Sequence, residues 1–361
     1  MLSCLIIADD LTGACDAAAA FAARGFRTLV EPVGAACEPE CEVFSINAES
    51  RALEPPELEQ VFAGIRARDL PARIVFKKID STLRGNAGRE IALAAEAFGC
   101  DAAVIAPAFP AMGRIVESGV LRVRGAPCPV DLEDYWRAQK LEGCVHTSCA
   151  AAAAAFEAGA RYVSVDAVCD GDLDAIVEFG AGLKGRILWA GSAGLAHAMA
   201  RRLTPGVTPA PVPPGSFPAA LFCIGSTHSV TGQQVERLLS SRNAVLVESG
   251  AGQPEPIQKM LAAGRHVVLR ISRNAAPSRV AGLLAGSRAP LVLSGGDTAS
   301  LVCSAIGARC IELRGELATG IPAGVLRGGA MDALPVVTKA GGFGNPDTLV
   351  NIADYYTCPT P

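Results

Sequence analysis

LSCLIIADDLTGACD, residues 2–16, joins a run of seven mostly apolar side chains to two aspartates, a polar turn and an alanine-rich segment. A strand buried on both faces of a parallel sheet needs apolar side chains at nearly every position, and a helix usually follows it. The run has no basic start and is too short for a signal peptide. This stretch therefore predicts a parallel α/β fold in which Asp9 and Asp10 stand at the end of the first strand.

The same alternation of short apolar runs and helical stretches continues along the chain. Parallel sheets that helices cover on both faces have this pattern, and their ligands bind at the carboxyl ends of the strands. The further runs expected to be strands are residues 27–31, 43–46, 73–77, 102–106, 162–165, 187–189, 221–224, 244–247, 266–271, 291–293 and 334–337. We therefore expect an α/β protein whose sheets are mostly parallel and flanked by helices.

A proline-rich segment, Thr204–Pro218, divides the chain and contains six prolines. Because proline fixes φ and has no N–H to donate, this segment is expected to be an extended linker. A chain of 361 residues is also longer than one ordinary core requires. We expect two domains, residues 1–203 and 219–361, each with its own mostly parallel sheet.

Composition excludes several classes of protein. Lys and Arg number 32 against 36 Asp and Glu, without a basic stripe, which argues against nucleic acid but leaves room for an anionic small molecule. No apolar run reaches the length of about 18 residues that a membrane span needs. The 13 cysteines form no Cys-x-x-Cys pair and only four histidines are present, so we expect reduced thiols in a cytoplasmic protein and no metal site built by the chain.

The aspartates after the first strand are candidates for binding or catalysis. Asp9 and Asp10 are adjacent carboxylates that repel each other, so they favour a cation or a ligand rich in donors. One of them can bind substrate hydroxyls or deprotonate one. The alternative is a helix N-cap by Asp10 or Thr12, which accounts for one aspartate but not for both.

A denser polar cluster follows the run at residues 73–77. The sequence from Lys78 to Asn86 reads KIDSTLRGN. Arg84 can clamp a carboxylate with two hydrogen bonds, and Lys78 adds a second positive charge. Asp80 and Ser81 can contact a substrate hydroxyl. A solvated loop with a capping Ser81 or Thr82 is the alternative, although a plain loop does not require so many donors.

Two more arginines are expected at the same edge of the sheet. Arg51 follows the run at residues 43–46, and Arg114 follows a loop that two prolines make rigid. Both guanidinium groups are candidates for substrate binding. An exposed arginine beside a rigid turn is the alternative for Arg114.

The second half has three glycine-bearing turns after expected strands. Glycines let the backbone approach a phosphate closely, and the N–H groups at a helix start bind it. The turns contain Ser226, then Gly295, Gly296, Asp297 and Thr298, then Gly341 and Gly342. Together they predict a nucleotide site. The chain has neither a P-loop nor a dinucleotide-binding glycine motif.

Taken together, these motifs resemble the four-carbon acid sugar kinase family, formerly a domain of unknown function. The matching segments are residues 7–13, 78–86, 107–110 with 113–114, Gly225 and Ser226 with Thr231 and Gln234, 294–298, and 339–344. The resemblance implies a first domain that binds the acid sugar and a second that binds ATP. It places Asp10, Lys78, Asp80 and Arg84 at the substrate, and Ser226, Gly295, Gly296, Thr298 and Gly342 at ATP.

The activity implied by the resemblance is phosphorylation of the terminal hydroxyl of an acid such as threonate, erythronate or 3-oxo-tetronate. Such a transfer needs positioning and charge neutralisation, with Mg²⁺ on the phosphates. Asp10 and Asp80 are both candidates to orient or deprotonate the hydroxyl. The chain departs from the family in Asp297, where Glu is expected, and in a shorter segment between residues 226 and 295.

Other functions stay open at this point. They are a kinase for another hydroxy acid or a hydroxylated amino acid, a nucleotide-binding regulator without turnover, and a metal-dependent isomerase or hydrolase. The last leaves the glycine turns unexplained. A homodimer is compatible with the sequence, which does not fix the oligomeric state.

Overall fold

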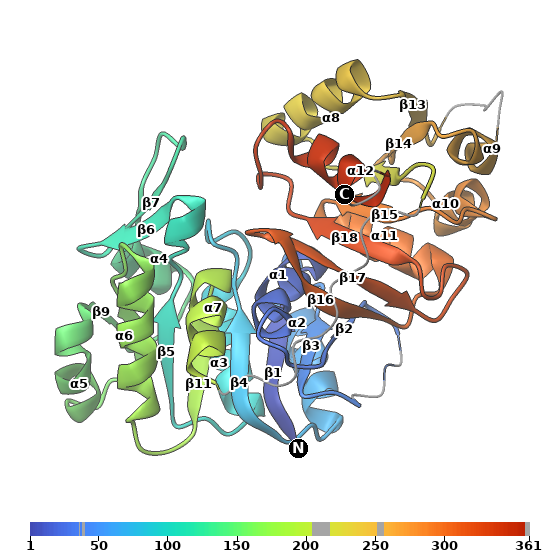
Figure 1. Cartoon of the computed structure of the whole chain (residues 1–361). Helices are drawn as coiled ribbons and strands as arrows, with labels where there is room; N and C mark the ends of the chain where they lie inside the picture. The colour runs from blue at the N-terminus through green and yellow to red at the C-terminus, as the bar shows by residue number, and fades with distance from the viewer. Residues whose placement is uncertain (36, 38–39, 204–216, 251–255, 358–361) are drawn as a thin grey trace.

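The computed structural model describes residues 1–35, 37, 40–203, 217–250 and 256–357 (Figure 1). Residues 204–216 of the expected linker lie outside the described residues. Within the described ranges, none of the helices combines the length and the apolar character needed to cross a bilayer.

One large mixed sheet organises the molecule, in the order β13-β14-β12-β15-β18-β17-β16-β2-β3-β1-β4-β11-β5-β10-β9. The strands of its first-half part are all parallel to one another, as are β12, β13, β14, β15 and β18 of the second half. The first-half strands are β1 (Leu2–Ala8), β2 (Thr28–Glu31), β3 (Val43–Asn47), β4 (Ala72–Lys78), β5 (Ala102–Ala106), β9 (Cys144–Thr147), β10 (Tyr162–Val165) and β11 (Ile187–Gly191). Those of the second half are β12 (Leu221–Ile224), β13 (Ala244–Glu248), β14 (His266–Arg270), β15 (Leu291–Ser294), β16 (Cys310–Ala318), β17 (Ile321–Arg327) and β18 (Pro335–Lys339).

The two parallel sets are joined through an antiparallel hairpin. β16 and β17 pair with each other, β17 pairs with β18, and β16 pairs with β2 so that Ile311 lies opposite Val30. The expected α/β class with a mostly parallel sheet is confirmed. One continuous sheet replaces the two separate sheets that the sequence suggested, because the hairpin supplies hydrogen bonds to both sets.

Helices cover both faces of the sheet (Figure 1). They are α1 (Leu11–Ala22), α2 (Pro55–Ala67), α3 (Ala87–Ala97), α5 (Cys149–Glu157), α6 (Asp170–Ala181), α7 (Ala193–Arg202), α8 (Ser229–Ser241), α9 (Ile257–Ala262), α10 (Pro277–Leu284), α11 (Gly296–Ile306) and α12 (Thr348–Thr357). A separate small sheet, β6 (Arg114–Glu117), β7 (Val120–Val123) and β8 (Val130–Asp131), projects from the first half beside α4 (Leu132–Ala138).

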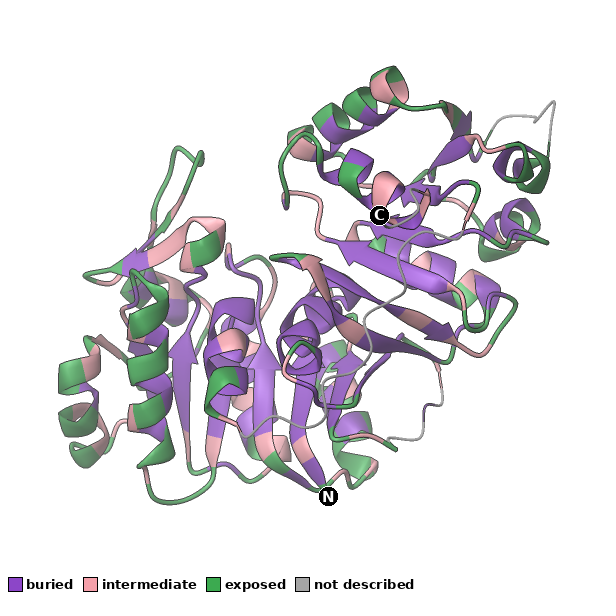
Figure 2. Ribbon diagram, in the orientation of Figure 1, coloured by how far each residue is buried: buried purple, intermediate pink, exposed green. Residues whose placement is uncertain are grey.

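Helix α1 lies at the junction of the two halves. All twelve of its residues are buried, and it packs against α7, α11, β3 and β16 (Figure 2). Its many alanines allow this close packing, since a helix that is apolar all round is stable only when it is buried on every side. The burial makes the few polar side chains of α1 conspicuous, because each one needs a partner in the interior or in a cavity.

Candidate functional site

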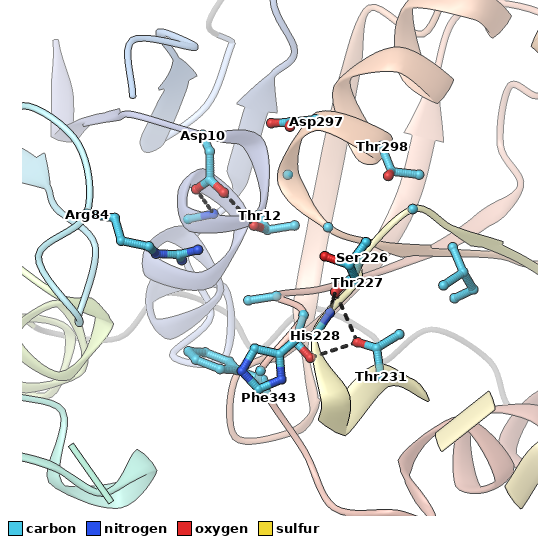
Figure 3. Close-up of a pocket in the computed structure, with 18 of the residues that line it drawn as sticks. Asp10, Thr12, Arg84, Ser226, Thr227, His228, Thr231, Asp297, Thr298 and Phe343 are labelled. Carbon is cyan, nitrogen blue, oxygen red and sulfur yellow. Dashed lines mark hydrogen bonds between the residues drawn. The ribbon is translucent and has the colours of Figure 1, made fainter. Parts of the chain in front are cut away.

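A cleft of about 1090 Å³ opens where the carboxyl ends of the parallel strands of both halves face each other (Figure 3). Its first-half wall comes from the segments that follow β1, β3 and β4. Its second-half wall comes from the turns after β12, β14, β15 and β18 and from the end of β13. The cleft thus lies where ligands bind in open parallel sheets.

The structure brings the sequence-predicted site residues to this one cleft. The residues that line it are Asp10, Arg51, Lys78, Asp80, Ser81, Arg84, Arg114, Ser226, Gly295, Gly296, Asp297, Thr298, Gly341 and Gly342. Asp9 lies just beneath its surface and is only 2% exposed. Its carboxylate accepts hydrogen bonds from Arg51 Nε at 2.7 Å and Nη2 at 3.0 Å, so Asp9 positions Arg51.

Asp10 combines the two roles that the sequence left open. It is the N-cap of α1, where Oδ1 accepts from the backbone N–H of Gly13 at 2.8 Å and Oδ2 accepts from Thr12 Oγ1 at 2.8 Å. Arg51 Nη1 also donates to Oδ2, at 3.0 Å. Both oxygens of Asp10 therefore have donors, although the residue still lines the cleft.

Asp80 holds the loop after β4 in shape. Its carboxylate accepts from Arg84 Nε at 3.0 Å and Nη2 at 2.7 Å, and from the backbone and the hydroxyl of Thr82. Burial alone would raise the pKa of Asp80, but the hydrogen bond and charge of Arg84, with Arg51 and Thr82, outweigh it and hold that pKa below its usual range. Asp80 is therefore an ionised group that orients two arginines.

The cationic side chains of the first half differ in their burial and in their ion-pair partners. Lys78 is buried, and its Nζ donates to the carbonyl of Ile79 at 2.9 Å. Arg84 pairs with Asp80 while 65% of its side chain stays exposed. Lys77, directly before Lys78, lies outside the cleft and pairs with Glu90 at 3.0 Å in the core. Lys78 and Arg84 thus both contribute positive charge to this wall.

Arg114 reaches the second half of the molecule. Its guanidinium lies over the ring of Phe343, 5.1 Å from the centroid, and Nη1 donates to the carbonyl of Met112. Burial lowers the pKa of Arg114, while Asp80 and Asp16 act in the opposite direction. Nε has no hydrogen-bond partner among the described residues. Arg114 therefore keeps a free donor where the two halves meet.

The glycine turns of the second half lie against one another. Gly295 precedes α11 with φ of 104°, a conformation that a side chain disfavours. An added Cβ at Gly341 would stand 2.1 Å from Ser226 Oγ, so the turns after β12 and β18 meet in a way that only glycine allows. Lys339 Nζ donates to the carbonyls of Ala340 and Gly341, which fixes the third turn.

The start of α11 meets the start of α1 across the cleft. An added Cβ at Gly296 would lie 2.4 Å from Asp10 Oδ2. The first N–H groups of a helix have no partner within it and carry partial positive charge, so they bind anions well. Thr298 is buried and Asp297 is exposed in this first turn. The arrangement is suited to the phosphates of a nucleotide.

Comparisons with known proteins match the two parts of the chain to different family models. A family model described as a sugar-binding N-terminal domain matches residues 4–140 and 130–199, and one described as a nucleotide-binding C-terminal domain matches residues 271–349. The chain is 33% identical to a D-threonate kinase of Bordetella bronchiseptica over 96% of each chain. The chain belongs to the four-carbon acid sugar kinase family.

Other relatives of this acid sugar kinase chain carry related names. A D-erythronate kinase of Heliobacterium modesticaldum is 30% identical, over 98% of this chain and 97% of its own. A crystal structure of a Salmonella typhimurium protein, described provisionally as a tRNA synthase, superposes with a TM-score of 0.76 at 22% identity, over 98% of this chain and 99% of its own. At that identity, the structural likeness shows the fold alone.

Sequence reasoning missed two acidic residues that line the cleft, the exposed Glu248 at the end of β13 and Asp16. Asp16 lies on α1, lines the cleft and is 6% exposed. Burial raises the pKa of Asp16 to about 6; Lys78 acts against that rise, and Asp10 adds to it. The available signal was a single carboxylate within an alanine-rich helix too apolar to have a solvent face. His228 and Phe343, which also line the cleft, were likewise not among the expected site residues.

Proposed function

We propose that this chain is an ATP-dependent kinase that transfers the γ-phosphoryl group to the terminal hydroxyl of a four-carbon acid sugar, with D-threonate the first acid to test. The observation that carries this proposal is one cleft that joins the arginines and lysine of the first-half wall to the glycine turns at a helix start on the second-half wall. The names of the full-length relatives support the choice of substrate class.

On the first-half wall, we assign the acid's carboxylate to Lys78, Arg84 and Arg114. Ser81 and Arg51 contact its hydroxyls. Asp9, Asp10 and Asp80 hold these cations in place, because their carboxylates already accept hydrogen bonds from Arg51 or Arg84. The candidates Asp10 and Asp80 thus act in this proposal by orienting the site, with residues 1–203 as the substrate-binding domain.

On the second-half wall, we assign the phosphates of ATP to the backbone of Gly295, Gly296, Gly341 and Gly342. The hydroxyls of Ser226 and Thr298 assist them, and residues 219–361 form the nucleotide-binding domain. The exposed carboxylate of Asp297, in the first turn of α11, is a suitable oxygen donor for Mg²⁺. Mg²⁺ supplies neutralisation of phosphate charge in such a transfer.

Three expectations remain predictions alongside this proposal. They are closure of the two walls around the substrates, a homodimer and a cytoplasmic location. Light scattering after size-exclusion chromatography tests the dimer directly. Small-angle scattering with and without Mg-ATP and the acid tests closure, which would exclude water from the transfer.

The decisive experiment for the proposal is coupled ADP release with Mg-ATP. The panel contains the threonates, the erythronates, 3-oxo-tetronates and hydroxylated amino acids. One strongly favoured four-carbon acid, with the phosphate located on its terminal hydroxyl by NMR, is the expected result. A favoured amino acid would replace the substrate class, and ATP binding without turnover on any acid would favour a regulator instead.

A further inference from the structure

A kinase acting on a hydroxyl benefits from a group that accepts its proton, and the two expected candidates are already occupied. Asp10 accepts from Gly13 N–H, from the Thr12 hydroxyl and from Arg51. Asp80 accepts from Thr82 and Arg84. Hydrogen bonds and cations favour the ionised form of a carboxylate and so make it a weaker base.

Among the described residues of the first-half wall, Asp16 is the carboxylate that is not occupied in this way. It belongs to α1, and its Oδ1 is buried without a hydrogen-bond partner among the described residues. A buried polar oxygen is normally paired, because an unpaired one has lost its water without replacement. Asp16 also lines the cleft, so its carboxylate is placed where it can accept a hydrogen bond from the hydroxyl of a bound ligand.

The surroundings of Asp16 suit a base at neutral pH. Its pKa is raised to about 6, mainly by burial; Lys78 and Arg114 oppose the rise, and Asp10 and Asp80 add to it. Glu316 of β16 is the other carboxyl that interacts with it; burial raises the pKa of Glu316 to about 8, so at pH 7 that group is mostly uncharged. The His197 imidazole, whose Nε2 lies 3.7 Å from Glu316 Oε2, is neutral as well, because burial lowers its pKa to about 4.

We propose that Asp16 is the catalytic base that accepts the proton of the attacking hydroxyl, an inference that rests on the proposed kinase function. The O–H bond of the acid's terminal hydroxyl breaks, and its proton passes to the carboxylate of Asp16. The hydroxyl oxygen forms a bond to the γ-phosphorus as the bond between that phosphorus and the β,γ-bridging oxygen breaks. ADP leaves with the electron pair, and Asp16 returns the proton to solvent.

The test compares the full-length protein with its Asp16→Asn variant, which keeps the shape of the side chain. General-base catalysis contributes about 10²- to 10⁴-fold, so kcat should fall by that factor. The KM values for the acid and for Mg-ATP should stay within about threefold. In the wild type, kcat should fall below an apparent pKa near 6, and the residual activity of the variant should lack that acidic limb.

Two further variants distinguish a base from a structural residue. Asp16→Ala removes the carboxylate, and formate added to the assay should restore part of its kcat by occupying the vacated space. Glu316→Gln is the matched control, since it changes a neighbouring buried carboxyl that is already uncharged at pH 7. It should leave kcat within about threefold of the wild type. The decrease of kcat at acidic pH should occur at the same pH as in the wild type.

The outcomes separate the two proposals. If Asp16→Asn keeps kcat within about threefold, or if its residual activity keeps the acidic limb, Asp16 is not the base although the kinase proposal stands. If the wild type transfers phosphoryl groups to none of the acids, the kinase proposal fails and the role of Asp16 falls with it.

Discussion

At the scale of single residues, the cleft is built by carboxylates that fix cations. Asp9 and Asp10 hold Arg51, and Asp80 holds Arg84, before any substrate is bound. A guanidinium that is already oriented loses less side-chain entropy when it binds a ligand. The paired charges also limit the repulsion among Arg51, Arg84 and Lys78. Substrate affinity should therefore depend on the aspartates as much as on the cations.

Asp80→Asn tests this dependence. The amide cannot accept hydrogen bonds as a carboxylate does, so Arg84 loses its orientation, and we expect KM for the acid to rise at least about tenfold. The loss of a buried paired charge should lower the free energy of unfolding by about 1–3 kcal/mol. Because the pKa of Asp80 is depressed in the folded protein, its stabilisation is present above its ordinary pKa and lost as the pH falls below it.

The control for Asp80→Asn is Asp174→Asn. Asp174 pairs with Arg201 at 2.7 Å on the exposed surface, where the loss of an ion pair costs less than about 1 kcal/mol. Steady-state kinetics and urea unfolding of both variants provide the comparison. Equal effects at the two positions would contradict a special role for Asp80.

Asp16 allows a prediction of stability with a defined dependence on pH. Its pKa is higher in the folded protein than in the unfolded chain, so its favourable contribution exists at low pH and is lost as the pH rises through about 6. We therefore compare the free energy of unfolding of Asp16→Asn with that of the wild type. The variant's advantage should be about 2 kcal/mol larger at pH 8 than at pH 4. Urea unfolding at the two pH values measures that difference, and a gain that is independent of pH would refute the ionised state of Asp16 at pH 8.

At the scale of elements, the two walls of the cleft meet where the helices α1 and α11 start. Helix α11 begins at Gly296 directly beside Asp10, the N-cap of α1. A side chain at Gly296 would push these helices apart and move the N–H groups of the α11 start. The alignment of the two walls therefore depends on the absence of one Cβ atom.

Gly296→Ala should lower kcat/KM for Mg-ATP by at least about tenfold, because the new Cβ would stand 2.4 Å from Asp10 Oδ2. Gly282→Ala in α10 is the matched control, since nothing lies within 4 Å of its added Cβ. Alanine is the better helix former, so the control should gain about 0.5–1 kcal/mol of stability and keep its activity. Isothermal titration with ATP and thermal unfolding measure both effects. Undiminished ATP use by Gly296→Ala would argue against the close approach.

Elements governed by neighbouring residues could be predicted from the sequence. The apolar run at residues 73–77 became β4, and the polar cluster beginning at Lys78 came to the cleft as expected. The hairpin of β16 and β17 was not predicted, because its pairing with β2 joins residues about 280 positions apart and leaves no local pattern. Asp16 was missed because a lone acid within a helix is not distinguished by spacing; its burial and its place in the cleft show that it belongs to the site.

At the scale of the whole molecule, the two halves are tied together at several places. β16 pairs with β2, Asn47 Nδ2 donates to Ser300 Oγ at 3.0 Å, and the rings of Phe109 and Phe343 lie 6.3 Å apart. Helix α1 packs against elements of both halves. Such shared contacts make the stability of each half depend on the other.

We therefore expect calorimetry to show one unfolding transition for the unliganded protein, with equal calorimetric and van't Hoff enthalpies. Leu313→Asp places a charge at a buried position where β16 meets β2. This variant should show two unfolding transitions instead of one. Arg314→Asp, at the next and less buried position of the same strand, is the comparison variant and should keep one. Two transitions in the wild type would show that the halves unfold independently.

The pairing of β2 with β16 also affects how the chain is made. During synthesis, β2 leaves the ribosome about 280 residues before the strand that will pair with its outer edge. At about 5–20 residues per second, that edge waits roughly 15 to 60 s for its partner. An unpaired edge invites pairing with other nascent chains. The demand for a chaperone should therefore be greatest while the second half is still being translated.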